Sequence, residues 1–323
     1  MKRWFTLLVL VAGLCLPPQF TAFIPQGAEW TFTLQAKNKK AKKNKQKKAK
    51  KQKAAKSKAH RAPRVKAPRT APKAGTALPL FSSSQPVSSL PQNPLLRVVL
   101  PKGTSNQTVN YKAITVYFNN QMRIPNCVAY ELTNTMVAMA DAPGAERRKN
   151  YAFNADTHVS RSPGGGDYRG SGYTRGHMAP AMDMRWDRQT MTECFLMTNM
   201  CPQHEKLNNG EWRQLEERIH RWAKRDGRLI ILTGPIIADG ALMSIGPRND
   251  IAVPRAFYKV IYAPNQNRAI AFIYDNDSPK GGLQRHAVTI NDVERRTHLN
   301  FLTSLPADTQ RRIKAQCNLD EWK

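Results

Sequence analysis

From residue 112 onward, short apolar runs alternate with clusters of turn-forming residues, a pattern typical of β-strands joined by loops. Two runs, "AFYKVIYAP" (256–264) and "RAIAFIYDN" (268–276), predict an antiparallel pair. The glycine-rich stretch "SPGGGDYRGSGY" (162–173) predicts a long loop. Further strands are predicted at "AITVYF" (113–118), "NCVAYELT" (126–133), "ECFLMTNM" (193–200) and "RLIILTGPII" (228–237).

One segment, "NNGEWRQLEERIHRWAKRDG" (208–227), has the period of a helix. Gly227 is a favourable residue for the end of that helix. With strands elsewhere, the predicted fold class is α+β, with a mixed, mostly antiparallel sheet. The apolar residues that recur at i, i+3, i+7 and i+10 are Trp212, Leu215, Ile219 and Trp222.

The formal charge of +28 is concentrated near the N-terminus. Residues 37–73 contain 18 Lys or Arg and no acidic residue, whereas residues 97–323 contain 31 basic and 22 acidic residues. Such a run cannot bury enough apolar surface to offset the entropy cost of ordering, so residues 23–96 are predicted to be a disordered basic arm and Pro/Ser-rich linker. The arm suits a polyanionic partner, with a solubilising role as the alternative.

The first residues, "MKRWFTLLVLVAGLCLPPQF", combine a basic start with about a dozen apolar residues and a Pro-Pro break. This pattern predicts a signal peptide over 1–22, and hence a secreted or periplasmic protein. The apolar run is too short for a confident membrane anchor, so no stable membrane insertion is expected. The remaining chain, 97–323, is predicted to form one folded domain.

Four cysteines follow the predicted signal peptide. In an exported protein an even number permits disulfides, so we expect at least one, with four buried free thiols as the alternative. A zinc site is disfavoured because Cys194 and Cys201 lack the close C-x2-C spacing. The four residues are Cys127, Cys194, Cys201 and Cys317.

His177 stands in "TRGHMAP" (174–180), two residues after Arg175. A histidine beside a strand is more often a hydrogen-bonded structural residue than a catalyst. Phosphodiester cleavage needs a base to take a proton from water and positive charge to offset the charge developing on phosphorus. A neutral imidazole can be that base, and a divalent ion with an arginine can supply the charge.

Candidate groups for holding such an ion follow in "TNMCPQHEKLNNGEWRQLEE" (198–217). Asn208 and Glu216, if both helical, would be about 12 Å apart along the axis, which favours one direct ligand and one group acting through water. Each also has a structural interpretation. Asn208 could form a capping box with Glu211, and Asn199 could satisfy backbone groups in a turn. Glu216 could instead pair with Arg213 or His220.

Taken together, three segments resemble the DNA/RNA non-specific endonuclease family, which includes sugar-non-specific bacterial nucleases and mitochondrial endonuclease G. The similarity extends over most of 97–323. It implies a ββα-metal fold, in which a β-hairpin and a helix hold one divalent ion. The segments are "DYRGSGYTRGHMAPAMDM" (167–184), "MTNMCPQ" (197–203) and "LNNGEWRQLEE" (207–217).

The resemblance also implies roles for individual residues. His177 would be the general base. Asn208 would bind a magnesium ion directly, with manganese as an alternative metal, and Glu216 would hold a metal-bound water. Arg175 and Asn199 would support the site and the phosphate. The expected activity is metal-dependent hydrolysis of DNA and RNA with little sequence preference.

The chain departs from the family pattern at two positions. Thr174 stands where the family usually has Asp, and His220 replaces a basic residue found in several members. These changes put the rate and the pH optimum in doubt, but not the base or the metal ligand. The phosphate-steadying arginine of the family corresponds to Arg147 or Arg148.

Two other functions are compatible with the sequence. A decayed nuclease scaffold could bind nucleic acid without cutting it, and the arm could hold the protein on other polyanions. Retention of the candidate base and metal ligands argues against decay. An inhibitor protein would be a natural partner of such a nuclease.

Overall fold

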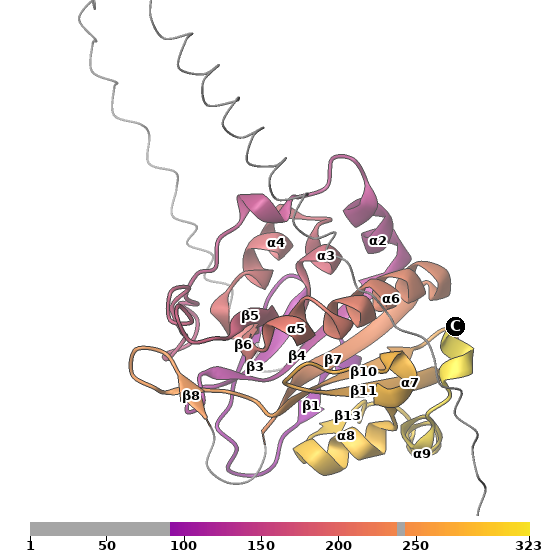
Figure 1. Ribbon diagram of the computed structural model, residues 1–323. Helices are drawn as coiled ribbons and strands as arrows, with labels where there is room; N and C mark the ends of the chain where they lie inside the picture. Colours follow the sequence, from indigo (N-terminus) through magenta and orange to yellow (C-terminus); the bar gives the residue numbers. More distant parts are fainter. Residues whose placement is uncertain (1–90, 238–242) are drawn as a thin grey trace, which may run out of the picture. The chain divides into compact units, whose positions relative to one another are not determined.

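The computed structural model describes residues 91–237 and 243–323. The predicted signal peptide and nearly all of the predicted arm and linker lie outside these residues. The described part is built on one seven-stranded sheet in the order β12-β11-β10-β7-β4-β3-β2, with every neighbouring pair antiparallel (Figure 1). In chain order its strands are β2 Gln107–Asn110, β3 Ile114–Asn119, β4 Ile124–Thr133, β7 Arg228–Ile236, β10 Ala256–Ala263, β11 Arg268–Asp275 and β12 Ala287–Val288.

Three short antiparallel pairs and several helices complete the fold. The pairs are β1 Val98–Val99 with β13 Asn300–Phe301, β5 Thr174–His177 with β6 Met200–Gln203, and β8 Ser244–Ile245 with β9 Ile251–Ala252. The α-helices are α2 Asn134–Asp141, α3 Ala181–Met184, α4 Arg188–Cys194, α5 Glu205–Asn208, α6 Glu211–Asp226, α7 Gly282–His286, α8 Ile290–Thr297 and α9 Ala307–Ala315. The 3-10 helices are η1 Pro94–Leu96, η2 Arg148–Asn150, η3 Met197–Asn199 and η4 Leu319–Trp322.

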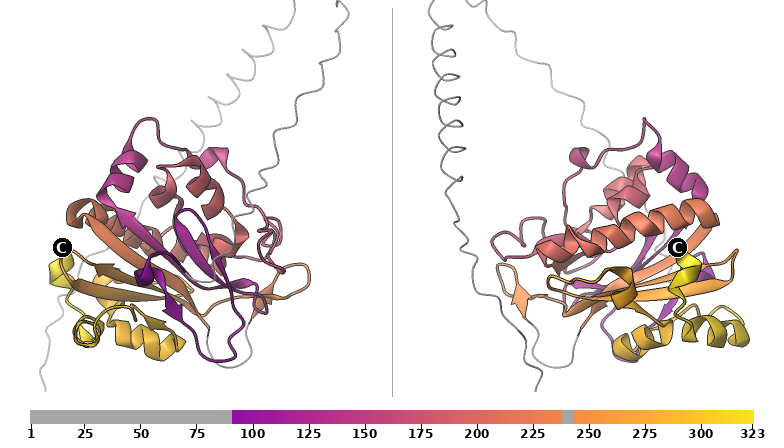
Figure 2. Two further views of the ribbon diagram at one scale, coloured as in Figure 1. Left: turned by 180° about the vertical axis from the view of Figure 1, so that it is seen from behind. Right: turned by 45° about the vertical axis from the view of Figure 1, so that its right-hand side comes forward.

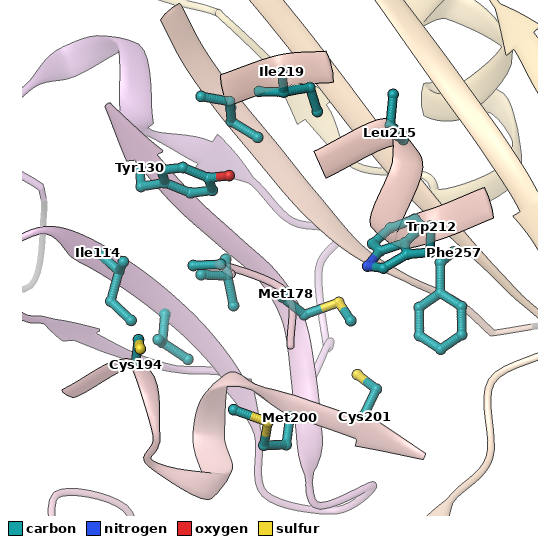
Figure 3. Close-up of a cluster of buried hydrophobic side chains, with 14 of the residues drawn as sticks. Ile114, Tyr130, Met178, Cys194, Met200, Cys201, Trp212, Leu215, Ile219 and Phe257 are labelled. Atoms are coloured by element: carbon teal, nitrogen blue, oxygen red, sulfur yellow. The ribbon is translucent and has the colours of Figure 1, made fainter. Parts of the chain in front are cut away.

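Helices cover both faces of the sheet, with α6 on one side and α8 and α9 on the other (Figures 1 and 2). Two separate apolar clusters result, one on each face. A strand covered on both faces is mostly apolar, which explains the hydrophobic run 229–232 of β7. On the α6 side, Trp212 and Leu215 pack with sheet residues such as Tyr130 and Phe257 (Figure 3).

Most of the predicted strands are confirmed, including the antiparallel pair β10–β11. The strand expected over 193–200 is wrong: α4 ends at Cys194, η3 follows, and β6 begins only at Met200. The side chain of Asp187 accepts hydrogen bonds from the backbone N–H groups of Gln189 and Thr190, and this cap starts the helix. The capped helix therefore takes up residues 193–194, the first two of the run predicted to be a strand.

The helix predicted over 208–227 is interrupted near its start. Asn208 ends α5, and α6 begins at Glu211 after Gly210, which is the N-cap and has no side-chain cap. A Cβ at Gly210 would lie 2.3 Å from the carbonyl oxygen of Lys206, so this tight corner requires glycine. The proposed capping box of Asn208 and Glu211 is therefore wrong, whereas the end at Gly227, with φ of 86°, is confirmed.

The expected disulfide does not form. All four cysteines of the described part are free. Cys127 belongs to the apolar cluster on one face of the sheet, while Cys194 and Cys201 belong to the cluster on the other face. Cys317 is exposed beyond α9. The three buried thiols are free and serve as apolar packing groups of the core.

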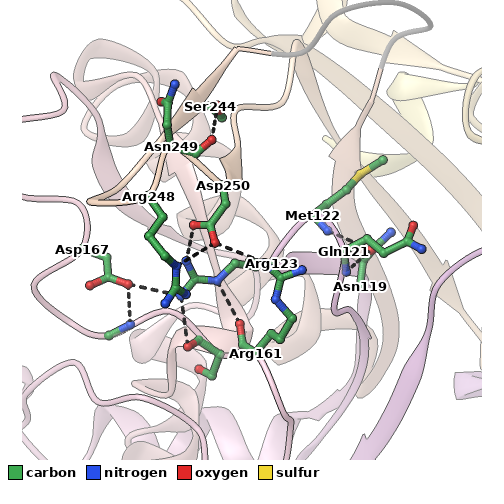
Figure 4. A network of polar contacts seen from close by, with 12 residues as sticks. Asn119, Gln121, Met122, Arg123, Arg161, Asp167, Ser244, Arg248, Asn249 and Asp250 are labelled. Atoms are coloured by element: carbon green, nitrogen blue, oxygen red, sulfur yellow. Dashed lines mark hydrogen bonds and ion pairs between the residues drawn. The ribbon is translucent and has the colours of Figure 1, made fainter.

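The glycine-rich segment 162–173 forms turns without strands or helices, as predicted. Buried Arg123 fixes one end of this loop. Its guanidinium donates to the Arg161 carbonyl oxygen at 3.1 Å and to the Asp167 carboxylate at 3.3 Å, and it also pairs with Asp250 (Figure 4). Asp250 in turn binds Arg248 at 3.1 Å. Charged hydrogen bonds thus hold the loop against the β8–β9 region.

Candidate active site

His177 is the last residue of β5, and the β5–β6 pairing fixes its position. The register pairs Thr174 with Gln203 and His177 with Met200. A Cβ on Gly176 would lie 2.2 Å from Gln203 Oε1 and 2.6 Å from Gln203 Cβ. The glycine before the histidine is therefore required by close approach of the two strands.

The imidazole of His177 is buried between aromatic rings. The ring centroids of Phe153 and Phe195 lie 5.5 and 5.0 Å away. Burial lowers the pKa of His177 to about 3, and the charges of Arg148, Lys259 and Arg175 lower it in the same direction. The side chain is therefore neutral near pH 7.

Nε2 of His177 has no hydrogen-bond partner among the described residues. A buried polar atom without a partner is costly in a structural residue, and it is what a base awaiting a water or substrate proton would present. His177 is therefore not the fully hydrogen-bonded structural histidine that was the alternative to a catalytic residue.

Arg175 reaches from β5 into a cleft of about 390 Å³. Its guanidinium stacks 4.4 Å from the ring centre of Phe153, and Nη1 donates to the Gly165 carbonyl oxygen at 2.6 Å. The remaining donors can serve an anion. The residues lining the cleft are Arg148, Phe153, Tyr168, Arg169, Tyr173, Thr174, Arg175, Asn208 and Asn209.

Arg148, in η2, is the better candidate for the second arginine of the site. It lines the cleft, whereas Arg147 does not. Its charge also lowers the pKa of His177 and that of Glu216. Three arginines, counting Arg169 on the glycine-rich loop, therefore give this cleft the positive charge that a phosphate backbone requires.

Asn208, at the end of α5, faces β5. Its Nδ2 donates to Thr174 Oγ1 at 2.9 Å, and Thr174 Oγ1 donates to the Gln203 carbonyl oxygen at 2.8 Å. Within the described residues Asn208 makes no other side-chain hydrogen bond, so its Oδ1 is available to a ligand.

Glu216, in α6, is buried, and its Oε1 has no hydrogen-bond partner among the described residues. Its nearest charged partner is Lys259, whose Nζ lies 3.8 Å away. Burial raises the pKa of Glu216 to about 8, although the Lys259 charge acts in the opposite direction. The suggested pairing with Arg213 or His220 is wrong, because Arg213 pairs with Glu217 and His220 pairs with Asp183 and Asp141.

Lys259 is the main site residue that the sequence analysis missed. It is fully buried in β10, and Nζ donates to the carbonyl oxygen of Met178, the residue after His177, at 2.9 Å. It also lies 4.5 Å from the centre of the Trp212 ring. Lys259 thus connects the end of β5 to Glu216. A single lysine inside the apolar run "AFYKVIYAP" was the available signal.

Asn199 supports the segment that follows His177. Its Nδ2 donates to the carbonyl oxygens of Ala179 and Cys194, and its Oδ1 accepts from the Ala179 N–H at 2.9 Å. These bonds commit both ends of the amide to the backbone. The Asn199 side chain therefore holds the backbone that follows His177.

His220, at the second departure from the family pattern, lies deeper in α6. Its Nδ1 is 2.8 Å from Asp183 Oδ1 and its Nε2 is 3.2 Å from Asp141 Oδ1. Tyr130 donates its hydroxyl to the other Asp183 oxygen at 3.0 Å. The side chain is thus held within a network beside the site instead of in the cleft.

The donor groups present fit a weakly held divalent ion. Among the described residues, no group of three or more His, Cys, Asp or Glu side chains could hold a metal. An amide oxygen on Asn208 and an unpartnered carboxylate oxygen on Glu216 are hard oxygen donors. Mg²⁺ keeps several waters and uses one or two protein groups, so this sparse oxygen set suits it better than zinc.

Comparison with known proteins agrees with this geometry. The family model described as DNA/RNA non-specific endonuclease matches residues 91–308. The chain belongs to this family, and it is a metal-dependent nuclease that acts on nucleic acids.

Individual relatives show the same relationship. "Nuclease" from Serratia marcescens is 27% identical over 66% of this chain and 82% of its own length. "Nuclease 1, mitochondrial" from Schizosaccharomyces pombe is 28% identical over 68% and 74%, respectively. A solved EndoG/EndoGI complex, whose title concerns EndoG inhibition, matches with a TM-score of 0.58 and 26% identity over 63% of this chain and 89% of that chain.

The expected secreted or periplasmic location is contradicted by these comparisons. The relative from S. pombe is named mitochondrial, as is endonuclease G from Homo sapiens, which is 29% identical over 51% of this chain and 60% of its own length. An apolar N-terminal run alone was thus a weak basis for assigning export. In the part of the chain that the structure describes, no helix is long and apolar enough to cross a membrane.

Proposed function

We propose that this nuclease cleaves internal phosphodiester bonds of DNA and RNA with His177 as the general base and one Mg²⁺ ion. The observation that carries the proposal is the neutral, buried imidazole whose Nε2 has no partner. An enzyme that activates water at neutral pH needs a proton acceptor that is uncharged and unoccupied.

In this mechanism the protein groups divide the work. Arg175 and Arg148, which line the cleft, bind the phosphate oxygens and compensate their growing charge. His177 takes a proton from the attacking water at Nε2. Asn199 holds the backbone after His177 in place.

The ion, when bound, polarises the phosphate and stabilises the leaving oxygen. Asn208 would hold it through Oδ1, and Glu216 would act through a water. None of these groups reads a base edge, which accounts for activity on both nucleic acids with little sequence preference.

A plasmid-nicking assay tests this function. We expect wild-type protein to nick with Mg²⁺ and to stop with EDTA, and we expect His177→Ala to lose about 10²–10⁴-fold in rate while keeping its DNA affinity. His158→Ala is a matched control, because His158 is an exposed histidine whose ring pairs with the Asp156 carboxylate and packs against the ring of Tyr111.

Melting temperatures show whether His177→Ala folds, since it leaves space between Phe153 and Phe195. Wild-type-like cleavage by folded His177→Ala would refute the general-base assignment. Binding without any metal-dependent cleavage by the wild type would favour a non-catalytic nucleic-acid-binding protein.

A further inference from the structure

Thr174, where the family usually has Asp, makes a directional pair of hydrogen bonds. Its Oγ1 lies 2.8 Å from the Gln203 carbonyl oxygen and 2.9 Å from Asn208 Nδ2. A hydroxyl has one proton, and a carbonyl oxygen can only accept. The Thr174 proton is therefore committed to Gln203, and the hydroxyl can only accept from Asn208.

This arrangement decides which end of the Asn208 amide faces β5. The two ends of an amide have nearly the same shape, so hydrogen bonds determine its orientation. Because Thr174 can only accept, it selects the NH₂ end of Asn208. The Oδ1 end is then left without a protein donor in the described part of the chain.

We propose that Thr174 is a positioning residue that holds the Asn208 amide in the orientation in which Oδ1 can bind the metal ion. The inference rests on the proposed function, in which Asn208 is the direct metal ligand. An Asp at this position would also accept from Nδ2, so Thr174 keeps the orienting bond without a second carboxylate beside the ion.

Metal binding by the full-length protein, without substrate, tests the inference. Mn²⁺ is the probe, because free and bound Mn²⁺ are distinguished by electron paramagnetic resonance. Loss of a residue that orients a metal ligand typically costs about 10–100-fold in metal affinity. We expect a loss of this size for Thr174→Val, which has nearly the same shape but no hydroxyl, and a change of less than about threefold for Thr174→Ser.

A second background separates orientation from a general structural effect. An Asp at position 208 has two equivalent oxygens and needs no selection of one end. In an Asn208→Asp background, Thr174→Val should therefore cost much less Mn²⁺ affinity than it does in the wild type. Thr174→Ala provides the same comparison if the valine variant does not fold.

Two results would overturn the inference. One is wild-type Mn²⁺ affinity in folded Thr174→Val, and the other is an equal loss of affinity in both backgrounds. Failure of the proposed function looks different: Asn208→Ala would then bind Mn²⁺ as tightly as the wild type.

Discussion

The Lys259 ammonium lies 3.8 Å from Glu216 Oε1 in the interior of the domain, and it connects β10 to α6. The same ammonium donates to the carbonyl oxygen of Met178, next to His177. One buried cation therefore links the strand end that carries the candidate base to the helix that carries the candidate metal-site carboxylate.

We expect Lys259→Met to lower the free energy of unfolding by about 3 kcal/mol, because it removes the buried positive charge that faces Glu216 and the donor to the Met178 carbonyl oxygen. Urea denaturation measures this change. The double variant with Glu216→Gln should lose less than the sum of the single changes, with a coupling of about 1 kcal/mol. Simple additivity of the two losses would show that the residues do not interact.

Asn208→Ala should lower the free energy of unfolding by about 1 kcal/mol, because it removes the hydrogen bond from Asn208 Nδ2 to Thr174 Oγ1. Mg²⁺ activation should weaken strongly, since the direct ligand is lost. Chemical denaturation and Mg²⁺ titration of the nicking rate check the two parts. An unchanged Mg²⁺ response would show that Asn208 does not hold the ion.

His220 should give the protein a pH-dependent stability. Burial disfavours the imidazolium, but the hydrogen bonds and charges of Asp183 and Asp141 outweigh burial and raise the pKa of His220. Tyr130 also bonds Asp183, and Lys224 lies 3.7 Å from Asp141. A raised pKa contributes stability that is fully present below the unfolded value, about 6.5, and is lost as pH rises through the folded value.

The difference in unfolding free energy between wild type and His220→Gln should thus be larger at about pH 6 than at about pH 9. Each unit of pKa shift corresponds to about 1.4 kcal/mol. Denaturation of both proteins at the two pH values measures the difference. A difference that grows with pH would show that His220 is buried in its neutral form.

Arg169→Ala should raise KM on duplex DNA with little change in kcat, because Arg169 lines the cleft from the glycine-rich loop and is exposed. A plot of the logarithm of the DNA-binding constant against the logarithm of the salt concentration has a negative slope. Loss of one phosphate contact should make this slope shallower by about 0.9. Arg296→Ala is a matched control, since Arg296 is exposed on α8, which covers the other face of the sheet. Equal effects of both substitutions would point to general charge instead of a cleft contact.

Deletion of residues 37–73 should weaken the salt dependence of DNA binding more than Arg169→Ala does, because this segment carries 18 Lys or Arg residues. If the arm is disordered, as its composition predicts, it adds binding charge without placing a group at the scissile phosphate. KM should therefore rise most at low salt while kcat stays within a few-fold. Identical salt slopes for full-length and truncated protein would assign the arm a role unrelated to substrate.

The sequence by itself determined the elements whose signal is local. The strands β10 and β11 and the apolar stripe of α6 follow from periodicity, because side chains on one face of an element must meet one core. Gly227 ended the helix where predicted, since its positive φ favours glycine. The sequence identified His177 and Asn208 as candidates because each lies in a contiguous motif, "TRGHMAP" and "LNNGEWRQLEE".

The contacts between residues far apart in the sequence were decided by the tertiary structure. Lys259 reached the site only because β10 packs under α6, and periodicity carries no information about which buried charges meet. Cys127 is buried on one face of the sheet and Cys194 and Cys201 on the other, a separation that the sequence does not show. The tight corner at Gly210 between α5 and α6 places Asn208 beside Thr174 instead of at the N-cap of α6. Such contacts are set by three-dimensional packing, in which close approach and burial outweigh local propensity.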